Sequence, residues 1–207
     1  MRFIPFLILA LVSAFLPASA ARAQGESETS SIYTKIDFET GCVRLSTDEV
    51  GASFSCAGHR GYGILFSESD LRQALFFGYV GPWYAADAWE SFGPFNQSND
   101  TVEWRLDGGR PFATILRWFI ENPNPDTGAP DEAHRGQVLV VSRVAQPGEG
   151  GACVVGYVDA LANSDANEMA REVADTLARD FTCMSDTPAY HGQRGPLAGE
   201  PVRVFGN

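Results

Sequence analysis

The sequence has a single lysine, Lys35, and its arginines are scattered along the chain rather than clustered. The formal net charge is −11 at pH 7, and binding to a polyphosphate depends on clustered basic residues that release counterions. We therefore expect no nucleic-acid partner. An anionic membrane surface would repel such a chain as well.

Long apolar runs are also missing. The longest, residues 3–16, follows Arg2 and is shorter than the roughly 20 residues that a membrane-spanning helix needs. Small residues suited to a signal peptidase follow it up to Ala23, which completes the pattern of a secretory signal. We expect residues 1–23 to be a signal peptide, with an uncleaved anchor as the alternative, and residues 24–31 to be a flexible leader. The mature protein is then periplasmic or secreted and has no transmembrane anchor.

Several motifs of catalysis are absent. The chain has no Gly-x-Ser-x-Gly elbow, no His-Glu-x-x-His, and no cysteine pair with the two-residue spacing of a zinc or redox site. No cofactor is expected.

The cysteine count indicates disulfides instead, because an even number in an exported chain favours bridges. Folding a hairpin over residues 41–56 sets Cys42 opposite Cys56, within disulfide range. A strand that begins at Cys153 and the helix that follows it rise by about the same 25 Å, so Cys183 returns to the strand's start. The expected pairs are Cys42 with Cys56 and Cys153 with Cys183.

Hydrophobic periodicity supplies the remaining elements. A clear hairpin is predicted over residues 101–120, and buried strands are predicted at residues 137–144 and 153–160. Asn163 or Ser164 caps a helix of roughly 17 residues with one apolar face.

These elements predict an α+β domain over residues 32–187. It is a largely antiparallel β-sheet with one long C-terminal α-helix packed on it and two disulfides. Residues 188–207 are rich in Gly and Pro and are interpreted as a C-terminal tail outside the domain.

Two stretches resemble a family of uncharacterised exported proteins of alphaproteobacteria. The first is TVEWRLDGGRPFATILRWFIEN at residues 101–122, and the second runs from GQVLVVSRV through CVVGYVDALANSDANEMAREVAD. The resemblance implies periplasmic residence and no known activity, so it transfers no functional residues.

An aromatic-rich segment, residues 76–95, is the main candidate for binding. Its glycines and prolines exclude one long regular element, so it either covers the sheet as part of the core or lines a ligand groove. The candidate ligand-binding residues are Trp83, Tyr84, Trp89 and Phe92.

Catalytic candidates are weaker. His59 lies three residues after Cys56 in a turn that the disulfide would hold rigid, and a carboxylate such as Asp70 or Asp87 would have to orient it. Paired carboxylates across a groove could instead hydrolyse glycans, with Asp87, Glu90 and Glu103 as candidates near the aromatic segment.

A long polar loop at residues 122–136 is the last candidate. It loosely resembles a calcium loop, although its glycine and its last glutamate are each displaced by one position. The candidate metal ligands are Asn124, Asp126, Asp131 and Glu132, and a solvated turn is the alternative.

Three functions follow from these features. The leading hypothesis is a non-enzymatic periplasmic binding or interaction module, whose partner is a protein, a small molecule or a glycan of the envelope. The alternatives are an envelope hydrolase that uses His59 and a structural or accessory envelope protein.

Overall fold

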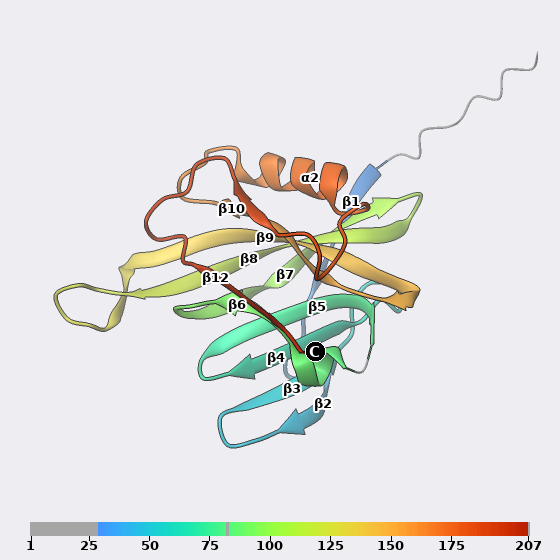
Figure 1. The fold of residues 1–207 in the computed structure, drawn as a ribbon, viewed down its shortest axis with the longest axis horizontal. Coiled ribbons are helices and arrows are strands. Elements are labelled where there is room, and N and C mark those ends of the chain that lie inside the picture. The colour runs from blue at the N-terminus through green and yellow to red at the C-terminus, as the bar shows by residue number, and fades with distance from the viewer. Residues whose placement is uncertain (1–28, 82, 207) are drawn as a thin grey trace, which may run out of the picture.

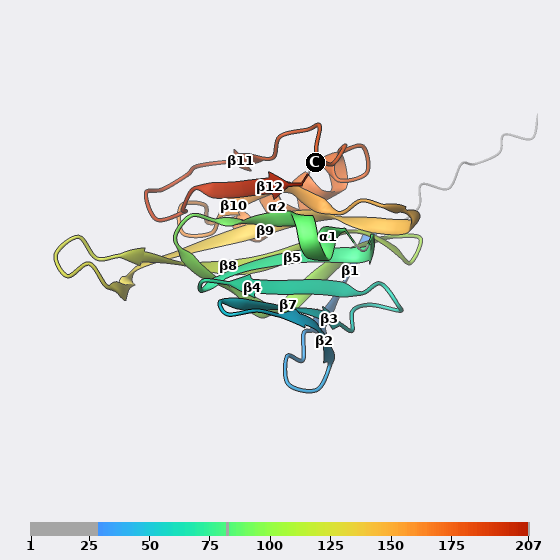
Figure 2. The ribbon, with the colours of Figure 1, turned by 60° about the horizontal axis from the view of Figure 1, so that its bottom comes forward.

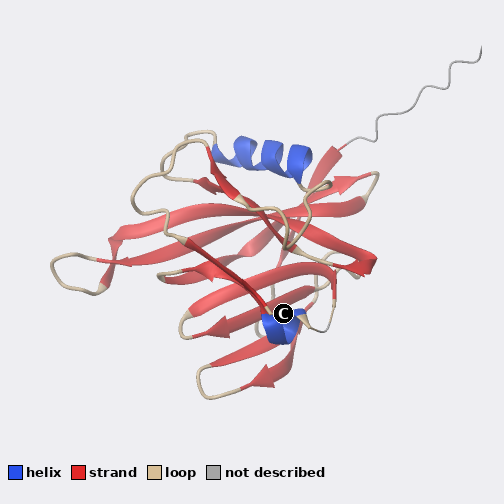
Figure 3. Cartoon of the chain, viewed as in Figure 1, coloured by secondary structure: helices blue, strands red, loops and turns tan. Residues whose placement is uncertain are grey.

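The computed structural model describes residues 29–81 and 83–206. Within these residues the fold is mostly β, with 58% of residues in strands and 9% in helices (Figure 3). The expected α+β class is therefore wrong. The strands are β1 (Thr29–Lys35), β2 (Cys42–Thr47), β3 (Gly51–Cys56), β4 (Ile64–Ser69), β5 (Arg72–Val80), β6 (Ala88–Phe92), β7 (Phe95–Asp107), β8 (Arg110–Pro123), β9 (Pro130–Gly150), β10 (Cys153–Asp159), β11 (Ala189–His191) and β12 (Pro201–Phe205), and the helices are α1 (Tyr84–Asp87) and α2 (Ala166–Leu177).

The observed fold class differs from the expected one because several segments that the sequence analysis did not assign to strands form strands in the structure. The aromatic segment ends β5 and continues through α1 and β6, and most of the expected loop 122–136 extends the β8–β9 hairpin. Residues 188–207, placed outside the domain by the sequence analysis, contribute β11 and β12. The helix is also shorter than expected, at 12 residues.

The long strand β9 organises the main sheet of ten strands (Figure 1). One edge of β9 pairs with β8, while the other pairs first with β10 and then, near its end, with β5. The sheet therefore forks at β9 into a branch β10–β11 and a branch β5–β4–β3–β2. Gly78 is required at the fork, because a Cβ there would lie 2.3 Å from the carbonyl oxygen of Ala145.

The main core contains side chains from both branches and from the strands between them, and Figure 2 shows the separate paths of the two branches. Trp104 and Trp118 of the β7–β8 hairpin pack there with Phe77 of β5 and Phe92 of β6. A separate two-stranded sheet, β6–β12, adds Phe92 to this core. On the opposite face of β8, β9 and β10, α2 buries its alanines and Val173, as its apolar periodicity predicted.

Both disulfides have the expected pairing. Cys42 and Cys56 are direct partners in the β2–β3 ladder, and Cys153 at the start of β10 is bonded to Cys183 beyond α2. Their Cα atoms are 4.0 Å and 5.6 Å apart respectively.

The N-terminal expectations have a different outcome. The proposed signal peptide, residues 1–23, lies outside the described residues, as does most of the proposed leader. The end of that leader, Thr29–Ser31, begins strand β1 and pairs with β7. Among the residues that the structure describes, no helix has the length and apolarity needed to cross a bilayer.

Candidate functional site

A buried ion pair joins the two strands of the small sheet. Antiparallel pairing of β6 with β12 sets Glu90 directly opposite Arg203, and Arg203 Nε donates a 2.6 Å hydrogen bond to Glu90 Oε1. The Glu90 side chain is completely buried, whereas 20% of the Arg203 side chain is exposed. The pair therefore has one member in the interior and one at the surface.

The second oxygen of Glu90 serves the main sheet. The backbone N–H of Val154 in β10 donates a 2.7 Å hydrogen bond to Oε2. Burial raises the pKa of Glu90 to about 7, although the charge of Arg203 and the hydrogen bond from Val154 act in the opposite direction. Both carboxylate oxygens are thus occupied and shielded, so Glu90 orients Arg203 and does not itself meet a ligand.

A cleft of about 400 Å³ opens beside this pair, between β11 and β12. Its floor includes Tyr157 of β10, whose ring lies 5.2 Å from that of Tyr190 in β11. Thr187, Pro188 and Ala189 form one wall.

The other side of the cleft carries charge. Arg203 lines it together with Arg194, whose guanidinium lies 4.4 Å from the centre of the Tyr190 ring. Arg194 also pairs with Glu200 at 2.6 Å, across the connection between β11 and β12. Two arginines therefore converge on one cleft of a strongly acidic protein.

Two buried polar atoms at the floor have no hydrogen-bond partner among the described residues. They are Tyr157 Oη and Arg203 Nη2. Burial and the nearby charge of Glu90 raise the pKa of Tyr157, so its hydroxyl remains protonated at neutral pH. Buried polar groups are nearly always paired in native proteins, and unpaired groups in a cleft indicate a functional site.

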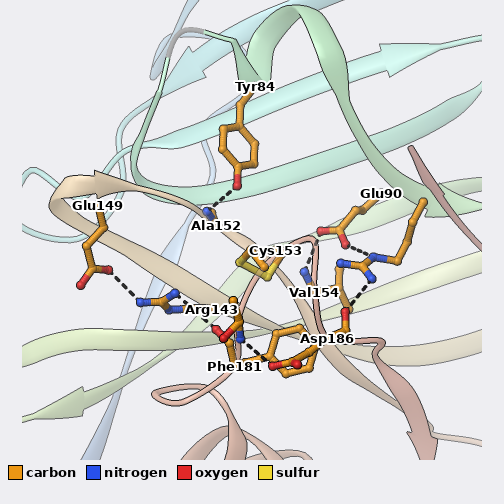
Figure 4. Close-up of a disulfide and its surroundings, with 12 residues drawn as sticks. Tyr84, Glu90, Arg143, Glu149, Ala152, Cys153, Val154, Phe181 and Asp186 are labelled. Carbon is orange, nitrogen blue, oxygen red and sulfur yellow. Dashed lines mark hydrogen bonds and ion pairs between the residues drawn. A yellow bond between two sulfur atoms is a disulfide. The ribbon is translucent and has the colours of Figure 1, made fainter. Parts of the chain in front are cut away.

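The second disulfide positions the wall of the cleft. Figure 4 shows Glu90 directed toward Val154, next to Cys153, with Asp186 nearby. Cys183 precedes this part of the wall, and the carbonyl of Asp186 accepts a 3.0 Å hydrogen bond from Arg203 Nη1. The bridge from Cys153 to Cys183 therefore ties the start of β10 to the segment that contacts Arg203.

The four candidate aromatic residues do not form one surface. Tyr84 and Phe92 are buried in the core, and the Tyr84 hydroxyl accepts a hydrogen bond from the backbone N–H of Ala152. Trp83 is 37% exposed and stacks on Tyr84 at 4.0 Å, while Trp89 is half-buried. Of the four, only Phe92 comes near the cleft, through its contact with Tyr157.

His59 is separated from its candidate carboxylates. It lies in the turn before β4, whereas Asp70 lies in the turn after it, and the six residues of β4 span about 17 Å. Asp87 lines a groove with Ser69, at the same far end of β4. Asp70 pairs instead with Arg72, and His59 Nε2 is buried with no hydrogen-bond partner in the described part of the chain. Burial, together with the charge of Arg60, lowers the pKa of His59.

The carboxylates considered for glycan hydrolysis occupy three different environments. Glu90 is enclosed as described, and Asp87 is exposed on α1. Glu103 is buried on β7, where it accepts hydrogen bonds from Arg171 of α2 and from Ser31. They do not face one another across a groove.

The candidate metal ligands are engaged in holding the β8–β9 turn. Asp131 accepts a 2.7 Å hydrogen bond from Asn124, and its other oxygen lies 2.7 Å from His134 Nδ1. These contacts lower the pKa of Asp131 to about 2. Asp126 and Glu132 are exposed, and within the described residues no group of three His, Cys, Asp or Glu side chains is placed to hold a metal ion. The Asp131–His134 pair is a contact that the sequence analysis did not predict.

Most residues of the cleft were also missed from sequence. Tyr157 was assigned to a strand without a role, and Tyr190, Arg194 and Arg203 fall in the segment interpreted as a tail. One signal was available, because Pro-Val-Arg-Val-Phe at residues 201–205 alternates with the period of a strand.

No family model matches the sequence, and neither the curated proteins nor the solved structures include a match to the chain. Its function is therefore inferred from the cleft itself.

Proposed function

We propose that the protein is a non-enzymatic binding module of the periplasm or the extracellular space. Its ligand carries a carboxylate and an apolar part and is held in the cleft between β11 and β12. The observation that carries this proposal is a pair of buried polar atoms, Tyr157 Oη and Arg203 Nη2, which have no partner among the described residues and belong to side chains that line a cleft together with Arg194 and one carboxylate, Glu200.

Charge supports an anionic ligand. The guanidinium of Arg203 is planar and presents parallel donors that match a carboxylate. Its Nε is held by the buried Glu90, so the guanidinium is fixed beside the cleft before a ligand arrives. Pro188, Ala189 and Pro201 supply apolar contacts beside it.

Burial supports binding rather than catalysis. Glu90 has a pKa suited to proton transfer near neutral pH, but its side chain has no exposed surface and both oxygens are bonded to the protein. A general acid or base must reach the proton that it transfers. Glu90 is a positioning residue for Arg203.

The two disulfides support residence outside the cytoplasm, because disulfides persist in oxidising compartments. Periplasmic or secreted residence agrees with the secretory pattern of residues 1–23 and with the resemblance to exported alphaproteobacterial proteins, and both stay predictions.

The test is a titration of isotope-labelled protein with 3-phenylpropionate, followed by NMR chemical shifts. We expect shifts that centre on residues 187–203 and on Tyr157, and a much weaker response to the matched neutral amide, 3-phenylpropionamide. Equal responses to the two compounds, or no response of these residues at millimolar concentration, would overturn the proposal. A structural envelope role predicts that second outcome.

A further inference from the structure

We infer that the natural ligand is the carboxyl terminus of a peptide chain, which enters the cleft end-on and leaves its last amide beside the backbone of Arg203. This inference rests on the proposed function and narrows its ligand class.

The first argument is the open edge of β12. Among the described residues β12 pairs only with β6, and the ladder includes hydrogen bonds from Gly93 N–H to Glu200 and from Gly206 N–H to Asp87. Hydrogen-bonded positions alternate along an antiparallel pair, so the N–H and C=O of Arg203 point away from β6, to the open edge. A peptide group can pair with a free N–H and C=O of this kind, as in strand addition.

The second argument is the absence of a free aromatic face in the cleft. The Tyr190 ring has Arg194 at 4.4 Å and the Tyr157 ring at 5.2 Å, and its hydroxyl donates to the carbonyl of Ala198. Tyr157 itself is 2% exposed. Sugars are commonly bound by stacking on an exposed ring, which these two tyrosines do not offer, so the lining favours a peptide over a glycan.

The third argument is the kind of hydrogen-bonding groups in the cleft. Arg194, Arg203 and Tyr157 supply donors, and the one carboxylate of the lining, Glu200, is already paired with Arg194. The donors at the floor then select the end that is an acceptor, which is the carboxylate and not the ammonium group.

The binding step involves one rearrangement. Arg203 Nη2 is buried, so the guanidinium must move to meet a ligand: it exchanges its Nη1 contact with Asp186 for the incoming carboxylate while Nε remains on Glu90. Tyr157 Oη donates to the same carboxylate. Pro188, Ala189 and Pro201 then surround the last side chain, which is expected to be small or apolar.

The experiment measures fluorescence anisotropy of a labelled tetrapeptide of glycine, serine, alanine and leucine with a free carboxyl terminus. We expect it to bind at least about tenfold more tightly than the same peptide ending in a carboxamide, because a charge-assisted pair is lost. It should also bind more tightly than 3-phenylpropionate, and methylation of its last backbone nitrogen should weaken binding. Hydrogen exchange of the Arg203 amide should slow in the complex.

Two matched tyrosine variants separate recognition from folding. Tyr157→Phe removes a hydroxyl that has no partner in the described protein, so the variant should fold with unchanged or higher stability and bind the peptide several-fold more weakly. Tyr79→Phe removes an exposed hydroxyl of β5 and should leave binding unchanged.

The outcomes distinguish the two proposals. If 3-phenylpropionate shifts the cleft residues but the peptide acid binds no better than its amide, the inference of a peptide terminus is wrong and the carboxylate cleft is retained. If neither compound affects residues 187–203, both proposals fail. Equal peptide affinities of wild type and Tyr157→Phe would also overturn the assigned geometry.

Discussion

Replacement of Glu90 by glutamine is expected to remove a defined pH dependence from the stability of the protein. The carboxyl titrates near pH 7 in the folded chain and near its ordinary value of 4.5 when unfolded. Between these values the native state holds a proton that the unfolded chain has released. The free energy of unfolding therefore falls as the pH rises toward 7 and is constant above it.

The size of this effect follows from the two pKa values. One pKa unit corresponds to about 1.4 kcal/mol, so the shift of Glu90 amounts to roughly 3 kcal/mol between pH 4.5 and pH 8. Glu90→Gln keeps the shape of the side chain but has no proton to release. It also leaves Arg203 without its charge partner, which changes the stability of the variant by an amount that does not depend on the titration of residue 90.

The assay is urea unfolding of both proteins, with disulfides intact, at several pH values from 5 to 8.5. The difference in unfolding free energy between wild type and Glu90→Gln should change by about 2 to 3 kcal/mol across this range, in the direction of a wild type that is relatively more stable at low pH. Glu132→Gln, at an exposed position of β9, is the control and should show a nearly constant difference. A constant difference for Glu90→Gln as well would refute the buried, proton-binding state of Glu90.

Three further predictions concern stability. Leu71 has a φ of +58° and is 61% exposed, so Leu71→Gly should raise the free energy of unfolding by up to about 1 kcal/mol in urea denaturation. A lower free energy of unfolding would show that the Leu71 side chain makes a stabilising contact. Arg105→Ala should lower the free energy of unfolding by about 3 kcal/mol or more, because Arg105 is buried and its two hydrogen bonds to Asp175 connect β7 to α2. A decrease below about 1 kcal/mol in the same assay would contradict this role. The double replacement of Cys42 and Cys56 by serine should lower the stability measured by thermal unfolding by about 3 kcal/mol. Peptide binding at the cleft should be unchanged, because this disulfide lies in the other branch of the sheet.

The Asp131–His134 pair at the β8–β9 turn shows that a polar pattern can have more than one structural use. Four oxygen-bearing residues in a Gly- and Pro-containing loop predicted a candidate cation site, but Asn124 and His134 occupy the carboxylate of Asp131. The same side chains that ligate a metal also stabilise turns, and spacing alone does not distinguish the two uses. The aromatic segment was ambiguous for a similar reason, because core and groove both favour aromatic residues.

The elements that could be predicted from sequence are those whose partners lie close along the chain. The β2–β3 hairpin, the β7–β8 hairpin, the amphipathic α2 and both disulfides were all predicted, because each depends on local periodicity, on a turn or on a short return of the chain. The mostly β class and the cleft became visible only in the folded chain. Glu90 and Arg203 are 113 residues apart, and they meet because the short strands that carry them pair with each other. Short strands of this kind have little intrinsic preference, so their formation and the site between them depend on long-range packing.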